Sequence, residues 1–80
     1  MDKTVLFSLE EIKNAEIAHT LHEVYLSLKE RGYNPINQIV GYLISGDPGY
    51  ISNYQDARKK ILELDRTELI ALLLTDYLKK

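Results

Sequence analysis

Apolar residues recur at helical spacing along most of the chain. Over residues 14–31 they stand three, four and seven positions apart, which places them on one face of a helix. Gly32 ends this helix, because glycine adopts the left-handed conformation of a helix C-cap at no steric cost. Asn34 caps the next helix, and Pro35 takes its first position, where a missing N–H costs nothing. This second helix is predicted to run to about Ser45.

The second half of the chain continues the helical pattern. Gly46 ends the second helix, a turn follows, and a third helix is predicted over residues 54–64. Asp65 begins a fourth helix, with Glu68 as the partner in a capping box. No segment alternates polar and apolar residues between hairpin turns. We therefore predict an all-α fold, a compact bundle of about four short helices.

The first residues of the chain show little periodicity. Ser8-Leu9-Glu10-Glu11 fits a capping box, so it either starts the first helix early or forms a short turn. We favour a flexible N-terminal arm over residues 1–13, followed by one helical domain over residues 14–80.

The fourth helix has an unusually wide apolar face. At 100° per residue this face covers roughly 260°, whereas the stripe of an ordinary surface helix covers ~100° or somewhat more. Thr75, Asp76 and Lys79 mark its clear polar side. The helix therefore lies either at the centre of the fold or against a second chain, and we favour a homodimer, the commonest closed oligomer. The expected dimer or partner surface contains Leu26, Ile70, Leu74, Tyr77 and Leu78.

The composition supports association between chains. A chain of 80 residues buries only ~60–65% of its unfolded surface, and the sequence has no cysteine for a disulfide. Oligomerisation is the remaining way to enlarge the core.

The longest apolar run, residues 69–74, is far too short to span a membrane, and the N-terminus does not resemble a signal peptide. We expect a cytoplasmic protein.

No set of residues predicts catalysis, a metal or a cofactor. His19 and His22 are three positions apart beside Glu23, but a zinc site needs three or four ligands. The glycines of residues 45–49 lack the Gly-Lys-Ser/Thr sequence that holds phosphate. We expect a protein that is not an enzyme.

The charge gives little attraction to nucleic acid. The net charge is −2 and the pI is about 5.6. Because the second and third helices flank a short turn, a helix-turn-helix-like DNA-binding module remains the alternative function. The run Arg58-Lys59-Lys60 is either a solvated face or a site for a phosphate or an acidic partner.

Specific motifs extend over nearly the whole chain. They are GYNPINQIVGYL at 32–43, SGDP at 45–48, YI at 50–51, DAR at 56–58, DR at 65–66, EL at 68–69 and YLK at 77–79. Together these motifs resemble the IreB family of small regulatory phosphoproteins from Gram-positive bacteria.

The resemblance implies a helical homodimer without catalytic activity. It implies phosphorylation by a membrane-anchored Ser/Thr kinase with extracellular PASTA repeats, and reversal by a phosphatase. It also implies an influence on cell-wall synthesis and antibiotic tolerance, in some members through Clp-dependent degradation of the first committed enzyme of peptidoglycan synthesis. The family's acceptor threonine lies in an Asp-x-Thr-x-x-Phe setting, which Asp2, Thr4 and Phe7 match, so Thr4 is the expected phosphorylation site.

The sequence departs from the family in two ways. Some members have a second acceptor threonine upstream, which this sequence lacks. Many have a more basic stretch around the third helix, where this chain retains Arg58 and Arg66 as candidate contacts for the phosphate or a target.

The arm is predicted to act as a switch. Without phosphate, Thr4, Leu6 and Phe7 would rest on the dimer or on a target. Phosphorylation adds about −1.5 to −2 charge and changes this docking, through repulsion by nearby carboxylates or capture by cations such as Arg58. The sequence does not decide between the two.

Overall fold

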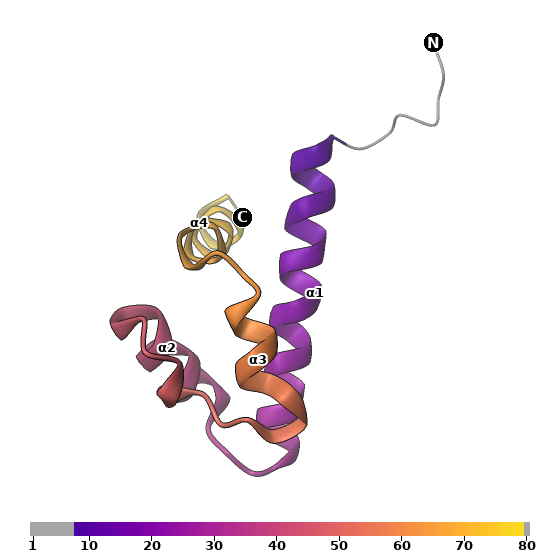
Figure 1. Ribbon diagram of the computed structural model, residues 1–80. Coiled ribbons are helices and arrows are strands. Elements are labelled where there is room, and N and C mark those ends of the chain that lie inside the picture. Colours follow the sequence, from indigo (N-terminus) through magenta and orange to yellow (C-terminus); the bar gives the residue numbers. More distant parts are fainter. Residues whose placement is uncertain (1–7, 80) are drawn as a thin grey trace.

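The computed structural model describes residues 8–79, which form four α-helices (Figure 1). The helices are α1 (Leu9–Glu30), α2 (Pro35–Ser45), α3 (Ala57–Leu62) and α4 (Arg66–Leu78). Two short 3-10 helices, η1 (Pro48–Tyr50) and η2 (Tyr54–Asp56), lie between α2 and α3. The described residues contain no strand, so the predicted all-α class is confirmed for this part of the chain.

Helix α1 begins earlier than predicted. The hydroxyl of Ser8 accepts a hydrogen bond from the Glu11 N–H at 3.1 Å, and the Glu11 carboxylate accepts one from the Ser8 N–H at 2.9 Å. This capping box stabilises the first turn, where backbone N–H groups have no partner within the helix. The prediction of an arm up to residue 13 is therefore wrong for residues 9–13, which are helical. Residues 1–7 lie outside the described part.

The two ends of α2 and the start of α4 fall where the sequence predicts them. The Asn34 side chain accepts a hydrogen bond from the Asn37 N–H at 3.1 Å, and Pro35 follows as the first helical residue. Gly46 ends α2 in the left-handed conformation, with φ at +75°. At the start of α4, Asp65 accepts a hydrogen bond from the Glu68 N–H at 3.0 Å. Side-chain caps at Asn34 and Asp65 and the left-handed Gly46 thus fix these boundaries.

The third helix is shorter than predicted. A continuous helix over residues 54–64 was expected, but Gln55 and Asp56 have φ values of +52° and +62°. Residues other than glycine rarely adopt this left-handed conformation, and it separates η2 from α3. The break brings the Gln55 side-chain oxygen within 2.9 Å of the buried Ser27 hydroxyl, which donates a hydrogen bond to it. A tertiary contact therefore accompanies the departure from helical geometry.

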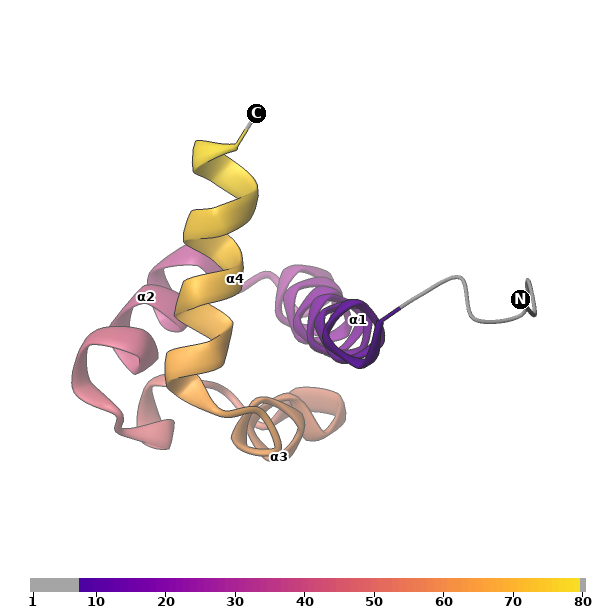
Figure 2. The ribbon, with the colours of Figure 1, turned by 90° about the horizontal axis from the view of Figure 1, so that it is seen from above.

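Helices α1, α2 and α3 enclose most of the hydrophobic core. In Figures 1 and 2, α3 lies along α1, and α2 lies at the same end of α1, where it also contacts α1 directly. The buried apolar residues are Ile17, Val24, Leu28, Ile39, Tyr42, Ile51, Ala57, Ile61 and Leu69. No buried side-chain nitrogen or oxygen in the described residues lacks a hydrogen-bond partner. The core is small, as expected for this chain length, and the buried polar side-chain atoms of the described residues all have hydrogen-bond partners.

Helix α4 projects from this body rather than running through it. Leu69 is its fully buried residue, and Leu72 packs against the core while remaining half-buried. Figure 2 shows the C-terminal part of α4 extending away from the other helices. The alternative prediction, a central fourth helix, is therefore wrong for the chain as described.

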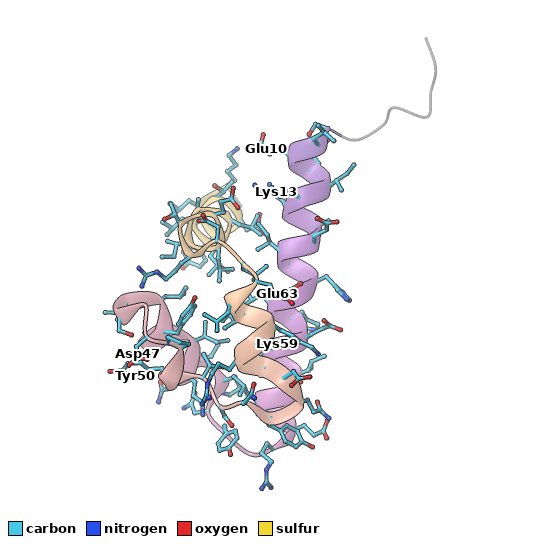
Figure 3. All side chains as sticks on the ribbon, in the orientation of Figure 1. Glu10, Lys13, Asp47, Tyr50, Lys59 and Glu63 are labelled. Carbon is cyan, nitrogen blue, oxygen red and sulfur yellow. The ribbon has the colours of Figure 1, made fainter. Side chains whose placement is uncertain are left out.

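The SGDP motif at residues 45–48 forms a tight turn at the end of α2. The Ser45 hydroxyl donates to the Gly41 carbonyl at 2.7 Å, and the Asp47 carboxylate accepts from the Gly49 N–H at 2.8 Å. Asp47 and Tyr50 lie together at this end of the molecule (Figure 3). Tyr50 packs on Gly41, where an added Cβ would come within 2.5 Å of the ring. These residues shape the connection after α2.

We predict that the contact between Gly41 and Tyr50 determines the effect of a methyl group at position 41. Gly41→Ala should lower the free energy of unfolding by about 1–2 kcal/mol, because the added Cβ displaces the ring. In a Tyr50→Ala background the same substitution should raise the free energy of unfolding by up to about 1 kcal/mol, because alanine has a higher helix propensity than glycine. Urea unfolding of the four proteins measures both values. An equal cost in both backgrounds would contradict this packing.

Candidate interaction surfaces

Helix α4 carries an exposed apolar side, which we call the α4 outer face. It consists of Ile70, Leu73, Leu74, Tyr77 and Leu78. The exposed fraction is 54% for Leu74, 74% for Tyr77 and 72% for Leu78, while Ile70 is half-buried. At 100° per residue these side chains share one side of the helix. A contiguous apolar surface of this kind is typical of protein–protein contact sites.

The structure groups four of the five predicted surface residues. Ile70, Leu74, Tyr77 and Leu78 share the α4 outer face, whereas Leu26 lies on α1. Leu26 is 50% exposed, and its position in the helix is roughly 180° from the buried Ile17. It also lies about 20 Å along α1 from Lys13, the residue that contacts α4. Leu26 is therefore separate from the α4 outer face.

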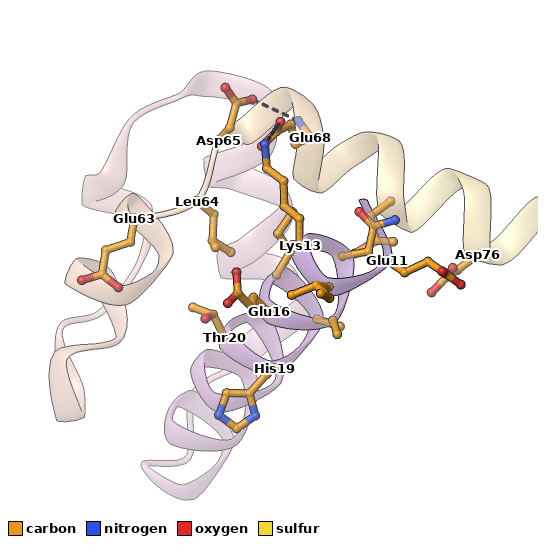
Figure 4. A pocket seen from close by; sticks show the side chains of 16 residues that line it. Glu11, Lys13, Glu16, His19, Thr20, Glu63, Leu64, Asp65, Glu68 and Asp76 are labelled. Atoms are coloured by element: carbon orange, nitrogen blue, oxygen red, sulfur yellow. Dashed lines mark hydrogen bonds and ion pairs between the residues drawn. The ribbon is translucent and has the colours of Figure 1, made fainter. Parts of the chain in front are cut away.

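The opposite side of α4 faces the N-terminal half of α1 across a groove. This α1–α4 groove has a volume of about 1140 Å³ (Figure 4). Its apolar lining includes Ile12, Ile17, Leu64 and Leu72. Asp76, from the polar side of α4 recognised in the sequence, lines the groove as well. Thus α4 has two exposed sides of different chemistry.

The α1–α4 groove is acidic. The described lining residues include six carboxylates, Glu11, Glu16, Glu63, Asp65, Glu68 and Asp76, against the cationic Lys13 and the titratable His19. The Lys13 ammonium lies 2.5 Å from the Glu68 carboxylate (Figure 4). This hydrogen bond and the charge of Glu68, with a smaller contribution from Asp65, raise the pKa of Lys13. Both side chains are well exposed, so the pair adds little stability.

The two candidate arginines lie away from this groove. The Arg58 Nε donates a hydrogen bond to the Ile51 carbonyl at 2.8 Å, and the residue is half-buried. Arg66 lies over Gly46 at the end of α2, with one guanidinium nitrogen 3.5 Å from the Leu43 carbonyl. Neither arginine is among the residues that line the groove. Both side chains therefore help to hold α2 and the segment after it.

The two histidines have different neighbours. The His19 Nε2 lies 3.6 Å from the Glu23 carboxylate, and the His22 ring stacks on Tyr25 with ring centres 6.1 Å apart. Within residues 8–79 no group of three or more His, Asp or Glu side chains is placed to hold a metal ion.

No helix in this same range combines the length and apolar character needed to cross a membrane.

Sequence reasoning found the α4 outer face but not the α1–α4 groove. The signal available was the polar side of α4 together with glutamates spread over α1. Their convergence depends on the angle at which α4 leaves the body after Leu64, which periodicity does not encode. Thr4 lies outside the described residues, so the structure gives no position for it.

Comparison with protein families supplies the remaining observation. The chain matches the model of a family described as IreB regulatory phosphoprotein, over residues 2–79. The match includes all four helices and also the segment with Asp2, Thr4 and Phe7. The resemblance inferred from the motifs is thereby confirmed. Because the match covers nearly the whole sequence, the chain belongs to the IreB family of regulatory phosphoproteins.

Proposed function

We propose that this chain is a non-catalytic regulator whose contacts with other proteins are controlled by phosphorylation of Thr4. A membrane-anchored Ser/Thr kinase with PASTA repeats adds the phosphate, and a partner phosphatase removes it. The observation that carries this proposal is the family match, which extends over the segment that contains Thr4. The exposed apolar residues of the α4 outer face support a role in protein contacts.

The proposed setting is the cytoplasm, where the chain modulates cell-wall synthesis and antibiotic tolerance. One route is regulated proteolysis of an enzyme of peptidoglycan synthesis, with the chain contacting the proteolytic machinery or the enzyme itself. Membership of a regulatory phosphoprotein family supports a regulatory role of this kind. The proposal requires surfaces for protein partners and requires no cofactor.

The proposed assembly is a symmetric homodimer formed through the α4 outer face. Leu74, Tyr77 and Leu78 are each more than half exposed in the single chain. Burying such residues against a second copy removes apolar area from water, which is the main driving force of association. In a two-fold interface each residue contributes twice, so a short helix can supply a useful area.

We predict that one charge on this face dissociates the dimer. Leu74→Asp should raise the dissociation constant about 100-fold, because two carboxylates would be buried without partners. Sedimentation equilibrium measures this constant. Ile44→Asp is the matched control, because Ile44 is an 80% exposed apolar residue of α2 outside the α4 outer face. Unchanged association of the Leu74 variant would rule out this interface, as would equal dissociation of both variants.

We predict that a PASTA-type kinase domain adds one phosphate to the wild-type protein and none to Thr4→Ala. Intact-mass analysis after incubation measures the modification. Thr67→Ala, which removes an exposed threonine of α4, should still accept the phosphate. Pull-downs with both phosphorylation states then test whether target binding changes. An unmodified wild-type protein in the presence of an active kinase would contradict the proposed regulation.

A further inference from the structure

We infer that residues 1–7 of this same chain occupy the α1–α4 groove when Thr4 is unmodified, and that a phosphate on Thr4 expels them. The docking of the segment is inferred from the geometry and the lining of the groove. The release step rests on the proposed phosphorylation of Thr4.

The position at which the segment joins the structure favours this occupant. Residues 1–7 precede Ser8, the N-cap of α1. Glu10 and Lys13 lie in the first turns of α1 and line a smaller pocket with Leu72 and Thr75 of α4. This pocket adjoins the groove, because Lys13 and Leu72 line both. Figure 3 shows Glu10 and Lys13 at the end of α1 that lies beside α4. The segment therefore starts at the edge of the groove.

The segment is long enough to fill it. Seven extended residues span at most about 24 Å. The α1 wall of the groove, residues 11–20, is ten residues of helix, or about 15 Å. A chain that turns back at Ser8 can follow this wall over its whole length.

The start of α1 supplies a reason for the chain to turn back. Next to a capping box, the residue before the N-cap commonly packs against the fourth helical residue, in a contact called a hydrophobic staple. Here these two residues are Phe7 and Ile12. Ile12 is 47% exposed and lines the groove. The staple would place Phe7 on the groove side of α1, and Val5 and Leu6 would continue along its apolar lining.

The charges of the groove determine the effect of a phosphate. Phosphorylation would add about −1.5 to −2 charge to a segment lying among six carboxylates. The cation of Lys13 is already paired with Glu68. The phosphate therefore meets a net negative surface, and repulsion favours the released segment.

Capture of the phosphate by Arg58 within the same chain is disfavoured by the level of α3 along α1 and by a hydrogen bond that Arg58 already makes. Thr4 and Ser8 are four positions apart in the sequence, which corresponds to at most about 14 Å of extended chain. The Ser27–Gln55 hydrogen bond sets the level of the start of α3, and Ser27 lies about 27 Å along α1 from Leu9. Arg58 is also held by its hydrogen bond to the Ile51 carbonyl. Repulsion thus remains as the effect inside one chain.

Arg66 does not offer an alternative site. Its side chain crosses to Gly46 at the end of α2, on the side of α4 away from the groove. A phosphate that stays beside the groove walls does not meet it.

The test uses a spin label on the arm. Because the chain has no cysteine, Lys3→Cys allows a nitroxide to be attached at one site of the full-length protein. Paramagnetic broadening of the NMR signals of Glu16, Leu72 and Asp76 then reports the segment in the groove. We expect strong broadening in the unmodified protein. Phosphorylation of Thr4, or Thr4→Glu, should lower the ratio of docked to released segment, by about tenfold for the phosphate.

Matched variants separate docking from proximity. Ile12→Ser should reduce the broadening, because it removes the partner of the staple. Val40→Ser should leave it unchanged, because Val40 is similarly exposed, at 45%, but lies on α2. Broadening confined to the first turn of α1 would overturn the inference and leave the groove to a separate partner. A sample that mixes spin-labelled and unlabelled copies separates docking within one chain from docking between chains. If the broadening occurs only between different copies, the segment docks on a second copy and the inference is overturned.

The two proposals fail in different ways. If the kinase does not modify Thr4 but the unmodified segment is docked, the docking inference stands and the proposed regulation fails. If the kinase modifies Thr4 and the groove signals never broaden, the regulation stands and the docking inference fails. Broadening that persists after phosphorylation would contradict repulsion as the mechanism.

Discussion

Leu69 anchors α4 to a core that the other three helices otherwise enclose. Leu69 is fully buried, and the neighbouring Glu68 and Leu72 reach toward α1 and the core. The rest of α4 receives little cover in the described part of the chain, so both of its remaining sides face outward (Figure 2). A helix with one main point of attachment depends on something else for its stability, because short helices gain most of theirs from tertiary packing.

The two exposed sides of α4 suit two different kinds of contact. The α4 outer face is almost entirely apolar, which fits the proposed second copy of the chain. The opposite side forms one wall of the acidic α1–α4 groove, which fits a segment controlled by negative charge. Since both sides belong to one helix, whatever fills the groove also supports the helix that carries the α4 outer face. The proposed phosphate on Thr4 can therefore influence a protein contact without lying in it.

Local signals predicted much of the fold from the sequence. Caps at Asn34, Gly46 and Asp65 act within one helical turn, so they are readable from neighbouring residues. The capping box of Ser8 is equally local, but the poor periodicity around it favours an arm in the sequence. The break at Gln55 was not readable, because its hydrogen-bond partner Ser27 is 28 residues away.

The interaction surfaces were predictable only in part, for the same reason. The width of the apolar side of α4 indicated a partner surface, since it exceeds what one small domain can cover. The position of Leu26 on its own helix suggested a contact residue, but the fold places it apart from α4. The groove, and the absence of Arg58 and Arg66 from its lining, follow from the angle between α1 and α4. Spacing along the chain carries no information on that angle.

The most direct test of this account measures amide hydrogen exchange in α4 as a function of protein concentration. Helix α4 is anchored mainly at Leu69, so it should gain protection when its outer face is covered. Amides of residues 70–78 should exchange faster in dilute than in concentrated solution, while those around Val24 and Leu28 should stay equally protected. Exchange in α4 that is slow at every concentration would show that the single chain stabilises this helix alone, and would contradict the account.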